Sequence, residues 1–174
     1  MATSMNGYIA QLDHNTPWTK DEFASYSQKV KECGNLIIGK TTHDLMQEEN
    51  AFTELGEPLV VVVTSSNEKP VRDKTVFVAS FKDAFNLLRQ KEFQTALVGG
   101  GGKLDVAALE SGLLEEIFID VEPWIFGNGI PLFSPSQTNL NLKLISTKKI
   151  GESGFQLHYQ VKNSKFMRRN RVTW

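Results

Sequence analysis

Short apolar runs alternate along the chain with segments of helical periodicity. The runs fall at residues 36–38, 59–63, 76–78, 96–98 and 117–121, and the second is apolar throughout, as in a strand buried on both faces. Two later runs, at 142–150 and 155–161, are separated by a glycine-containing segment at 151–154, which predicts a hairpin. The pattern predicts seven or eight strands.

Four short helices fit between these strands. An apolar stripe of Phe23, Tyr26, Val30 and Cys33 predicts a helix over residues 21–33. Ser80 is a suitable N-cap for a second helix, and Gly112 stands where a helix that includes Leu104 would end in a left-handed residue. Strands that alternate with helices indicate an α/β fold with a mixed, mostly parallel sheet.

Composition narrows the class of protein. The 174 residues are 40% hydrophobic and 22% charged, with a net charge of −1, so neither nucleic acid nor an acidic membrane surface is an expected partner. A lone cysteine, Cys33, excludes an intrachain disulfide, and no apolar run reaches the about 18 residues of a membrane span. We expect a cytoplasmic protein with one domain at 1–162 and a solvated basic tail at 163–174 that contains Lys165, Arg168, Arg169 and Arg171.

Four consecutive glycines carry the first chemical signal. A strand that ends at Val98 runs into Gly99, Gly100, Gly101 and Gly102, and a helix with Lys103 and Leu104 follows at once. Missing Cβ atoms allow a ligand close to the backbone, and the N–H groups of a helix N-terminus favour an anion such as a pyrophosphate. A plain glycine turn is the alternative interpretation.

Two further strands end in phosphate-binding residue types. Gly39, Lys40, Thr41 and Thr42 follow the strand at 36–38, and Thr64, Ser65 and Ser66 follow the strand at 59–63. Ligands of α/β sheets bind outside such strand ends. With a cation at Lys40 and no acid at the end of that strand, the pattern favours a 2′-phosphate, and hence NADPH over NADH.

Two sequence patterns of known nucleotide-binding sites resemble parts of this chain but do not fit its predicted structure. The glycine run lacks the third glycine of the dinucleotide fingerprint, because that position is Leu104. Residues 34–41 match the phosphate loop of nucleotide triphosphatases, but their interior is the strand at 36–38, whose amides would be bonded within a sheet.

In this order, the segments resemble the dihydrofolate reductase-like superfamily. Residues 3–10 are similar to its first strand and loop, Pro17 and Trp18 follow at the family spacing, and the three phosphate segments match in sequence order. Residues 112–133, with an acidic pair, a strand and a glycine-rich turn into Pro-Leu-Phe, resemble the riboflavin-biosynthesis reductase branch. The resemblance implies the three-layer fold of that superfamily, with about eight strands, and a cis bond between Gly99 and Gly100.

The resemblance also implies roles for particular residues. Ala2 and Ile9 would contact a nicotinamide, Glu22 would grip a pterin-like ring, and Asp120 would face the same pocket. For Glu22 the alternative is a favourable place in the first turn of a helix. Riboflavin-type reductases are commonly dimeric, and the segment of Trp124, Ile125 and Phe126 is a candidate interface.

The sequence departs from the family in three ways. The first strand is short, Asn6 stands where the family commonly has aspartate, and a single cysteine cannot supply a deaminase zinc site.

Three hypotheses for the function follow. The favoured hypothesis is an NADPH-dependent reductase of a small pterin-like or ribosylaminopyrimidine substrate. The others are a reductase-like nucleotide-binding protein without turnover and, less favoured, a phosphate-loop triphosphatase. Three scattered histidines predict no metal site.

Overall fold

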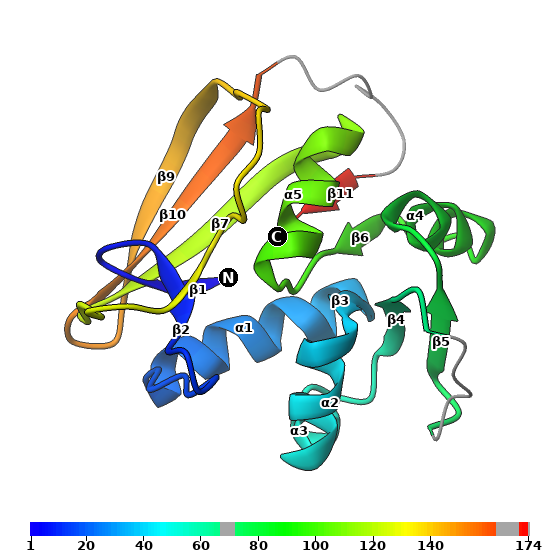
Figure 1. The fold of residues 1–174 in the computed structure, drawn as a ribbon, viewed down its shortest axis with the longest axis horizontal. Coiled ribbons are helices and arrows are strands. Elements are labelled where there is room, and N and C mark those ends of the chain that lie inside the picture. The colour runs from blue at the N-terminus through cyan, green and yellow to red at the C-terminus, as the bar shows by residue number, and fades with distance from the viewer. Residues whose placement is uncertain (67–71, 163–170, 174) are drawn as a thin grey trace.

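A computed structural model describes residues 1–66, 72–162 and 171–173 of the chain. Their helices and strands are arranged as Figure 1 shows. The helices are α1 (Lys20–Cys33), α2 (Lys40–Glu48), α3 (Ala51–Glu54), α4 (Phe81–Gln90) and α5 (Gly102–Ser111). The strands are β1 (Ala2–Ser4), β2 (Tyr8–Ala10), β3 (Asn35–Gly39), β4 (Leu59–Val63), β5 (Thr75–Val78), β6 (Thr95–Leu97), β7 (Leu114–Glu122), β8 (Ile130–Pro131), β9 (Leu142–Ile150), β10 (Gly154–Val161) and β11 (Arg171–Thr173).

Eight strands follow one another in a single order, β5-β4-β3-β6-β11-β7-β10-β9. The parallel ladder β3-β4-β5 is joined to the larger sheet by a bridge between Ile37 and Val98, where the Gly99 N–H donates to the Ile37 carbonyl at 2.8 Å. In this order β10 runs antiparallel to both of its neighbours, β7 and β9, the other pairings are parallel, and β1 adds a further parallel pairing with β7. The predicted mixed, mostly parallel sheet is therefore confirmed.

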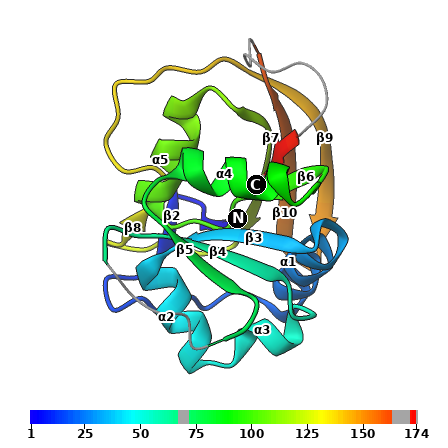
Figure 2. The same cartoon turned by 90° about the vertical axis from the view of Figure 1, so that its right-hand side faces the viewer.

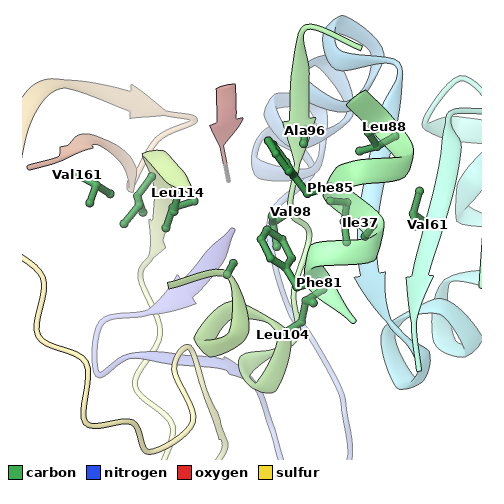
Figure 3. Close-up of a cluster of buried hydrophobic side chains, with 13 residues drawn as sticks. Ile37, Val61, Phe81, Phe85, Leu88, Ala96, Val98, Leu104, Leu114 and Val161 are labelled. Carbon is green, nitrogen blue, oxygen red and sulfur yellow. The ribbon is translucent and has the colours of Figure 1, made fainter. Parts of the chain in front are cut away.

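Helices cover both faces of the β3-β4-β5 ladder (Figure 2). Ile37 and Val61 point into a cluster with α4 and α5 (Figure 3), whereas their neighbours Leu36 and Val60 belong to a second cluster with α1 and α3. Strand residues alternate between faces, so a continuously apolar strand supplies two cores at once. Three layers result, as expected of the dihydrofolate reductase-like superfamily.

Most local signals are confirmed. Ser80 caps α4 by accepting the Asp83 N–H, Gly112 ends α5 in the left-handed region at φ 69°, and β9 and β10 form the predicted hairpin. The strand count was low because β2, β8 and β11 have only two or three residues each, and the helix count was low because α2 and α3 are separate helices. Such short elements have no hydrophobic period of their own.

The basic tail requires a correction. Arg171–Thr173 do not belong to a solvated terminus but form β11, which pairs in parallel with β6 and β7 in the middle of the sheet. Thr173 is buried, and its carbonyl accepts the Val98 N–H at 2.8 Å. Lys165, Arg168 and Arg169 lie outside the described residues. A strand of three residues inserted between two others gains its stability from pairing that the local sequence does not reveal.

Candidate functional site

A cleft of about 660 Å³ opens where α1, α2 and the glycine segment before α5 approach one another. Its walls include most of the residues that the sequence singled out for a cofactor. Those that line it are Ala2, Ile9, Gly39, Lys40, Thr41, Thr42, Gly99, Gly101, Gly102, Lys103 and Leu104, and Glu22 lines it as well.

Two helix N-termini in this cleft have no side-chain cap. Thr19 caps α1 and Ser80 caps α4 through their hydroxyls, whereas the N-cap residues of α2 and α5 are Gly39 and Gly101. The two uncapped ends are adjacent, since the Gly39 N–H donates to the Gly100 carbonyl at 2.9 Å. Unsatisfied N–H groups and two partial positive charges therefore converge on one spot, which suits a pyrophosphate.

The four glycines of the run have different roles. A Cβ on Gly101 would lie 3.6 Å from Thr42 Oγ1 and 3.7 Å from Ile9 Cδ1, in ordinary contact on the cleft wall. A Cβ on Gly99 would instead lie 2.7 Å from Leu36 Cδ1, and one on Gly102 would lie 2.5 Å from the Pro131 carbonyl oxygen. Only Gly101 is thus a glycine that leaves room for a ligand, while the other two are required by the protein's own packing.

Gly100 departs from expectation in two ways. It does not line the cleft, and its φ of 87° lies in the left-handed region, so its conformation itself favours glycine. The cis peptide bond joins Gly100 to Gly101, one residue later than the resemblance implied. Its backbone conformation therefore accounts for this glycine without a ligand, and a role of Gly100 in binding the cofactor stays a prediction.

The polar turn after β4 does not reach the cleft wall. Val63 lines the cleft, but Thr64, Ser65 and Ser66 do not, and the Thr64 hydroxyl accepts the Ser66 N–H at 3.1 Å. Val98 is likewise absent from the wall, because it is buried between β3 and β11. A role of the turn in binding an adenosine phosphate stays a prediction.

Lys40 does have an acidic neighbour, contrary to the sequence interpretation. Its ammonium lies 2.5 Å from Asp44 Oδ2, one helical turn further along α2, and the His43 ring nitrogen Nδ1 lies 3.0 Å from the other oxygen of Asp44. Burial tends to raise the pKa of Asp44, but hydrogen bonds and charge from Lys40 and His43 outweigh it and lower that pKa. A phosphate that binds Lys40 must therefore compete with Asp44.

The opposite end of the cleft contains a buried acid with an unusual environment. Thr19 and Glu22 have the spacing of a capping box, in which the glutamate would reach back to the Thr19 N–H. Here the Thr19 hydroxyl accepts the Glu22 N–H at 3.2 Å, but the Thr19 N–H donates to Glu122 Oε2 at 2.9 Å. Glu122 has taken the place of Glu22 in the cap, and the carboxyl of Glu22 lines the cleft instead.

Burial raises the pKa of Glu22 to about 7. The ammonium group of Met1 opposes this rise, and the negative charges of Asp120 and Glu122 add to it. Burial also raises the pKa of Tyr26, one turn further along α1, with a contribution from the charge of Glu22. The cleft therefore presents a carboxyl that exchanges its proton near neutral pH beside a phenol that keeps its own.

Asp120 is placed differently from the expectation. It does not line the cleft but lies buried behind Glu22 on β7, where its Oδ1 accepts a hydrogen bond from the Gln156 side chain at 2.8 Å. Burial raises its pKa, and the Met1 ammonium and Gln156 oppose the rise. Asp120 acts on the cleft through its charge.

Several cleft residues were missed from the sequence as site residues. They include His14, Thr16, Trp18, Phe23, Tyr26, Leu45, Met46 and Glu49. Two signals were available for part of this set. Glu22 and Tyr26 are four residues apart and so share a helix face, and the spacing from Thr19 to Glu22 marks the helix start that places them.

Asn6 has a structural explanation. Its side-chain amide donates to the Phe126 carbonyl at 2.7 Å and accepts the Phe126 N–H at 3.1 Å, so it joins the loop after β1 to the loop after β7. An ionised aspartate could only accept and would leave one of these bonds unmade. The departure from the family therefore fits the local backbone.

The phosphate-loop pattern is excluded by the same fold. Gly34 is the left-handed C-cap of α1, and residues 36–38 lie in β3, paired in register with β4. The amides between the two glycines are used within the sheet and cannot surround a phosphate.

Comparison with known proteins agrees with this geometry. Residues 1–155 match the RibD C-terminal domain model. The chain belongs to the RibD C-terminal domain family. It is 27% identical over 165 residues to the uncharacterised Bacillus subtilis protein YwjB, with 91% of this chain and 94% of YwjB covered.

Solved structures with the same fold include two related to riboflavin biosynthesis. A protein of Shewanella sp. PV-4 named for that pathway is 25% identical, with a TM-score of 0.74 and 93% of this chain and 96% of that chain covered. The Thermotoga maritima deaminase and 5-amino-6-(5-phosphoribosylamino)uracil reductase is 17% identical, with a TM-score of 0.70, and this chain covers 54% of it. Among the helices described, none is both long and apolar enough to cross a membrane.

Proposed function

We propose that the protein is an NADPH-dependent reductase of a small nitrogen heterocycle. One observation carries the proposal: a single cleft joins two uncapped helix N-termini at one end to a buried carboxyl, Glu22, at the other. The first end matches the needs of a dinucleotide phosphate, and the second provides an acid whose pKa is about 7. Membership of the RibD C-terminal domain family agrees with this function.

The residues present fit the cofactor. The N–H groups at the starts of α2 and α5, with the hydroxyls of Thr41 and Thr42, would hold the pyrophosphate, and Lys40 would pair with the 2′-phosphate. Gly101 leaves the wall open beside Ile9 and Thr42. Ala2 and Ile9 also line the cleft, where they would contact the nicotinamide.

NADPH, when bound, supplies the hydride that reduces a C=N bond at its carbon. The nitrogen must gain a proton to complete the reduction. Glu22 lines the cleft, and with a pKa of about 7 it holds that proton in a substantial fraction of molecules at neutral pH. The aromatic side chains of Trp18 and Phe23 line the same cleft and would offer an apolar surface to a ring.

Fluorescence titration with NADPH, NADH and ATP tests the cofactor half of the proposal. We expect NADPH to bind at least tenfold more tightly than NADH, about 1.4 kcal/mol, and ATP weakly. Oxidation of NADPH in the presence of reducible pterins and ribosylaminouracils then tests turnover. Tight NADPH binding without oxidation by any of them would favour a reductase-like binding protein without turnover.

We also propose that the protein is a homodimer. Met5, Trp124 and Ile125 form an exposed apolar patch, in which the Met5 N–H donates to the Trp124 carbonyl and Ile125 is 73% exposed. Phe126, expected in this patch, is buried and stacks on Trp18 at 5.7 Å. Sedimentation at micromolar concentration should give the mass of a dimer, and Ile125→Glu should shift it toward the monomer. A monomeric mass for the unchanged protein would contradict the proposal.

A further inference from the structure

The two ends of the cleft carry charges of opposite sign. Among the described residues that line it, the lysines are Lys40 and Lys103, and both lie in the first turns of α2 and α5 at the glycine end. The acids on the wall are Glu22 and Glu49. Glu49 is at the other end of α2 from Lys40, and neither lysine is among the charges that shift the pKa of Glu22. The cleft therefore separates a place for an anion from a place where an anion is repelled.

The orientation of α2 reinforces this separation. The helix begins at Lys40 beside the glycine segment and ends at Glu48, with Glu49 as its C-cap, so the helix runs along the cleft wall with its negative end at the acidic side. Leu45 and Met46 line the wall between these ends. The helix dipole thus adds to the side-chain charges.

Further acids lie behind the wall. Asp120 and Glu122 are buried on β7, 3% and 1% exposed, close enough for their charges to act on Glu22. Lys148 acts on Asp120, and the Met1 ammonium lies near Glu22, so the negative charge is partly offset. The positive end of α1 also points here, but Thr19 and Glu122 already use its cap.

Resting on the proposed function, we propose that the substrate is a neutral or cationic nitrogen heterocycle without a phosphate or carboxylate arm. A ring fits between Trp18, Phe23 and Tyr26, with its basic or N–H edge toward Glu22. An anionic arm beside Glu22 and Glu49 would lose its hydration. Apart from the two lysines at the glycine end, the Met1 ammonium is the cation of the described wall, and it already acts on Glu22. The domain then differs in substrate from the phosphoribosylaminouracil reductase whose fold it shares.

Two matched probe pairs test this inference on NADP⁺-loaded protein by calorimetry. One pair is 5-amino-6-(ribosylamino)uracil with and without its 5′-phosphate, and the other is 7,8-dihydrofolate against 6-methyl-7,8-dihydropterin. We expect the probe without the anionic arm to bind at least tenfold more tightly in at least one pair, and more so at low salt. Equal or tighter binding of the armed probe in both pairs would overturn the inference.

Charge variants test whether the preference for the probe without an anionic arm depends on the acidic end of the cleft. Glu49→Gln should reduce the ratio of the two dissociation constants several-fold, because it removes one repelling charge from the wall. Glu48→Gln is the matched control, since Glu48 is an exposed neighbour that does not line the cleft, and the ratio should not change. Equal changes in both variants would contradict the assignment to the cleft.

The outcomes distinguish this inference from the proposed function. Failure of the protein to bind NADPH would refute the proposed function itself. Normal NADPH binding, combined with no binding of any of the four probes or of a cationic 2,4-diaminopyrimidine, would overturn the inference alone. In that case the acidic end would not be a heterocycle site.

Discussion

The two ends of the cleft are built in different ways. At the glycine end, backbone N–H groups of α2 and α5 dominate, and the residues that provide them are contiguous in sequence at 39–42 and 99–104. At the acidic end, Glu22 comes from α1, whereas Asp120 and Glu122 come from β7, about a hundred positions later. A backbone site leaves a motif in the sequence, but a site made from side chains of distant elements does not.

The largest effect is expected at the acidic end. Glu22→Gln should leave NADPH binding intact and reduce turnover by about two to four orders of magnitude, because the amide cannot give up a proton. Wild-type activity should fall as pH rises through about 7, since the protonated form of Glu22 is the active one and its pKa is about 7. Steady-state rates between pH 5 and 9 measure both.

The variant should lose this pH dependence along with its activity. Asp21→Asn is a suitable control, since Asp21 is in the same first turn of α1 but does not line the cleft. A Glu22→Gln enzyme with wild-type rates would show that Glu22 handles no proton, and would leave the cofactor end unaffected.

Glu122 offers a second way to change the acidic end without touching the substrate. Glu122→Ala removes the acceptor of the Thr19 N–H, and Glu22 is then the residue placed to take it, as in an ordinary capping box. We expect the apparent pKa in the activity profile to fall and turnover near neutral pH to drop at least tenfold. NADPH affinity, measured by fluorescence, should not change.

The conservative variant separates this positioning role from a structural one. Glu122→Gln keeps an oxygen for the Thr19 N–H but removes the charge that raises the pKa of Glu22. The Glu122→Gln variant should retain most of the turnover near pH 6, and its profile of activity against pH should shift modestly to lower pH. Identical losses in both variants at every pH would indicate general damage to the fold instead.

At the glycine end, the decisive variant is Gly101→Ala. A methyl group there meets no protein atom closer than 3.6 Å, so the fold should persist, but it would occupy the cleft wall at the start of α5. We expect NADPH affinity to fall about 100-fold, or about 2.7 kcal/mol. Gly127→Ala is the control, because a Cβ at Gly127 meets no atom within 4 Å. Unchanged NADPH affinity in Gly101→Ala would favour the alternative interpretation, in which the glycine segment is a plain turn and not a cofactor site.

Gly99 and Gly102 differ from Gly101 although all three belong to one motif. From sequence, all four glycines predict ligand approach, but the structure assigns Gly99 to the packing of Leu36 and Tyr26 and Gly102 to the approach of Pro131. The sequence could predict the motif and its place after a strand. It could not predict which absent side chain faces the ligand, because that depends on β3, α1 and the segment at β8, which are distant in sequence.

The same limit explains other differences between sequence and structure. Buried runs of five apolar residues and capped helices were predictable because their signals are local, as at residues 59–63 and Ser80. β11 was not, since three residues next to a basic stretch acquire their place only by pairing with β6 and β7. The sequence also could not predict that Glu122, and not Glu22, accepts the Thr19 N–H at the start of α1. The two carboxylates come close enough to compete for this N–H only in the folded chain.

The smallest expected effects concern Lys40 and the selection of the 2′-phosphate. Lys40→Ala should weaken NADPH about tenfold, near 1.4 kcal/mol, and leave NADH nearly unchanged, because only NADPH carries the group that Lys40 would pair with. Asp44→Asn should have the opposite effect and strengthen the binding of NADPH. It keeps the shape of the side chain but removes the charge that lies 2.5 Å from the Lys40 ammonium and would also repel a phosphate.

We expect Asp44→Asn to strengthen NADPH binding about threefold, since exposed ion pairs of this kind contribute at most about 1 kcal/mol. The order lysine before aspartate along a helix is also the weaker orientation for such a pair, so the phosphate need not overcome much. The double variant Lys40→Ala, Asp44→Asn should show that the two effects are not additive, because the charge of Asp44 acts largely through Lys40. Fluorescence titration of the four proteins with NADPH and NADH gives the complete cycle. Parallel changes for both cofactors would mean that Lys40 binds the shared pyrophosphate, and that selection of the 2′-phosphate lies elsewhere in the cleft.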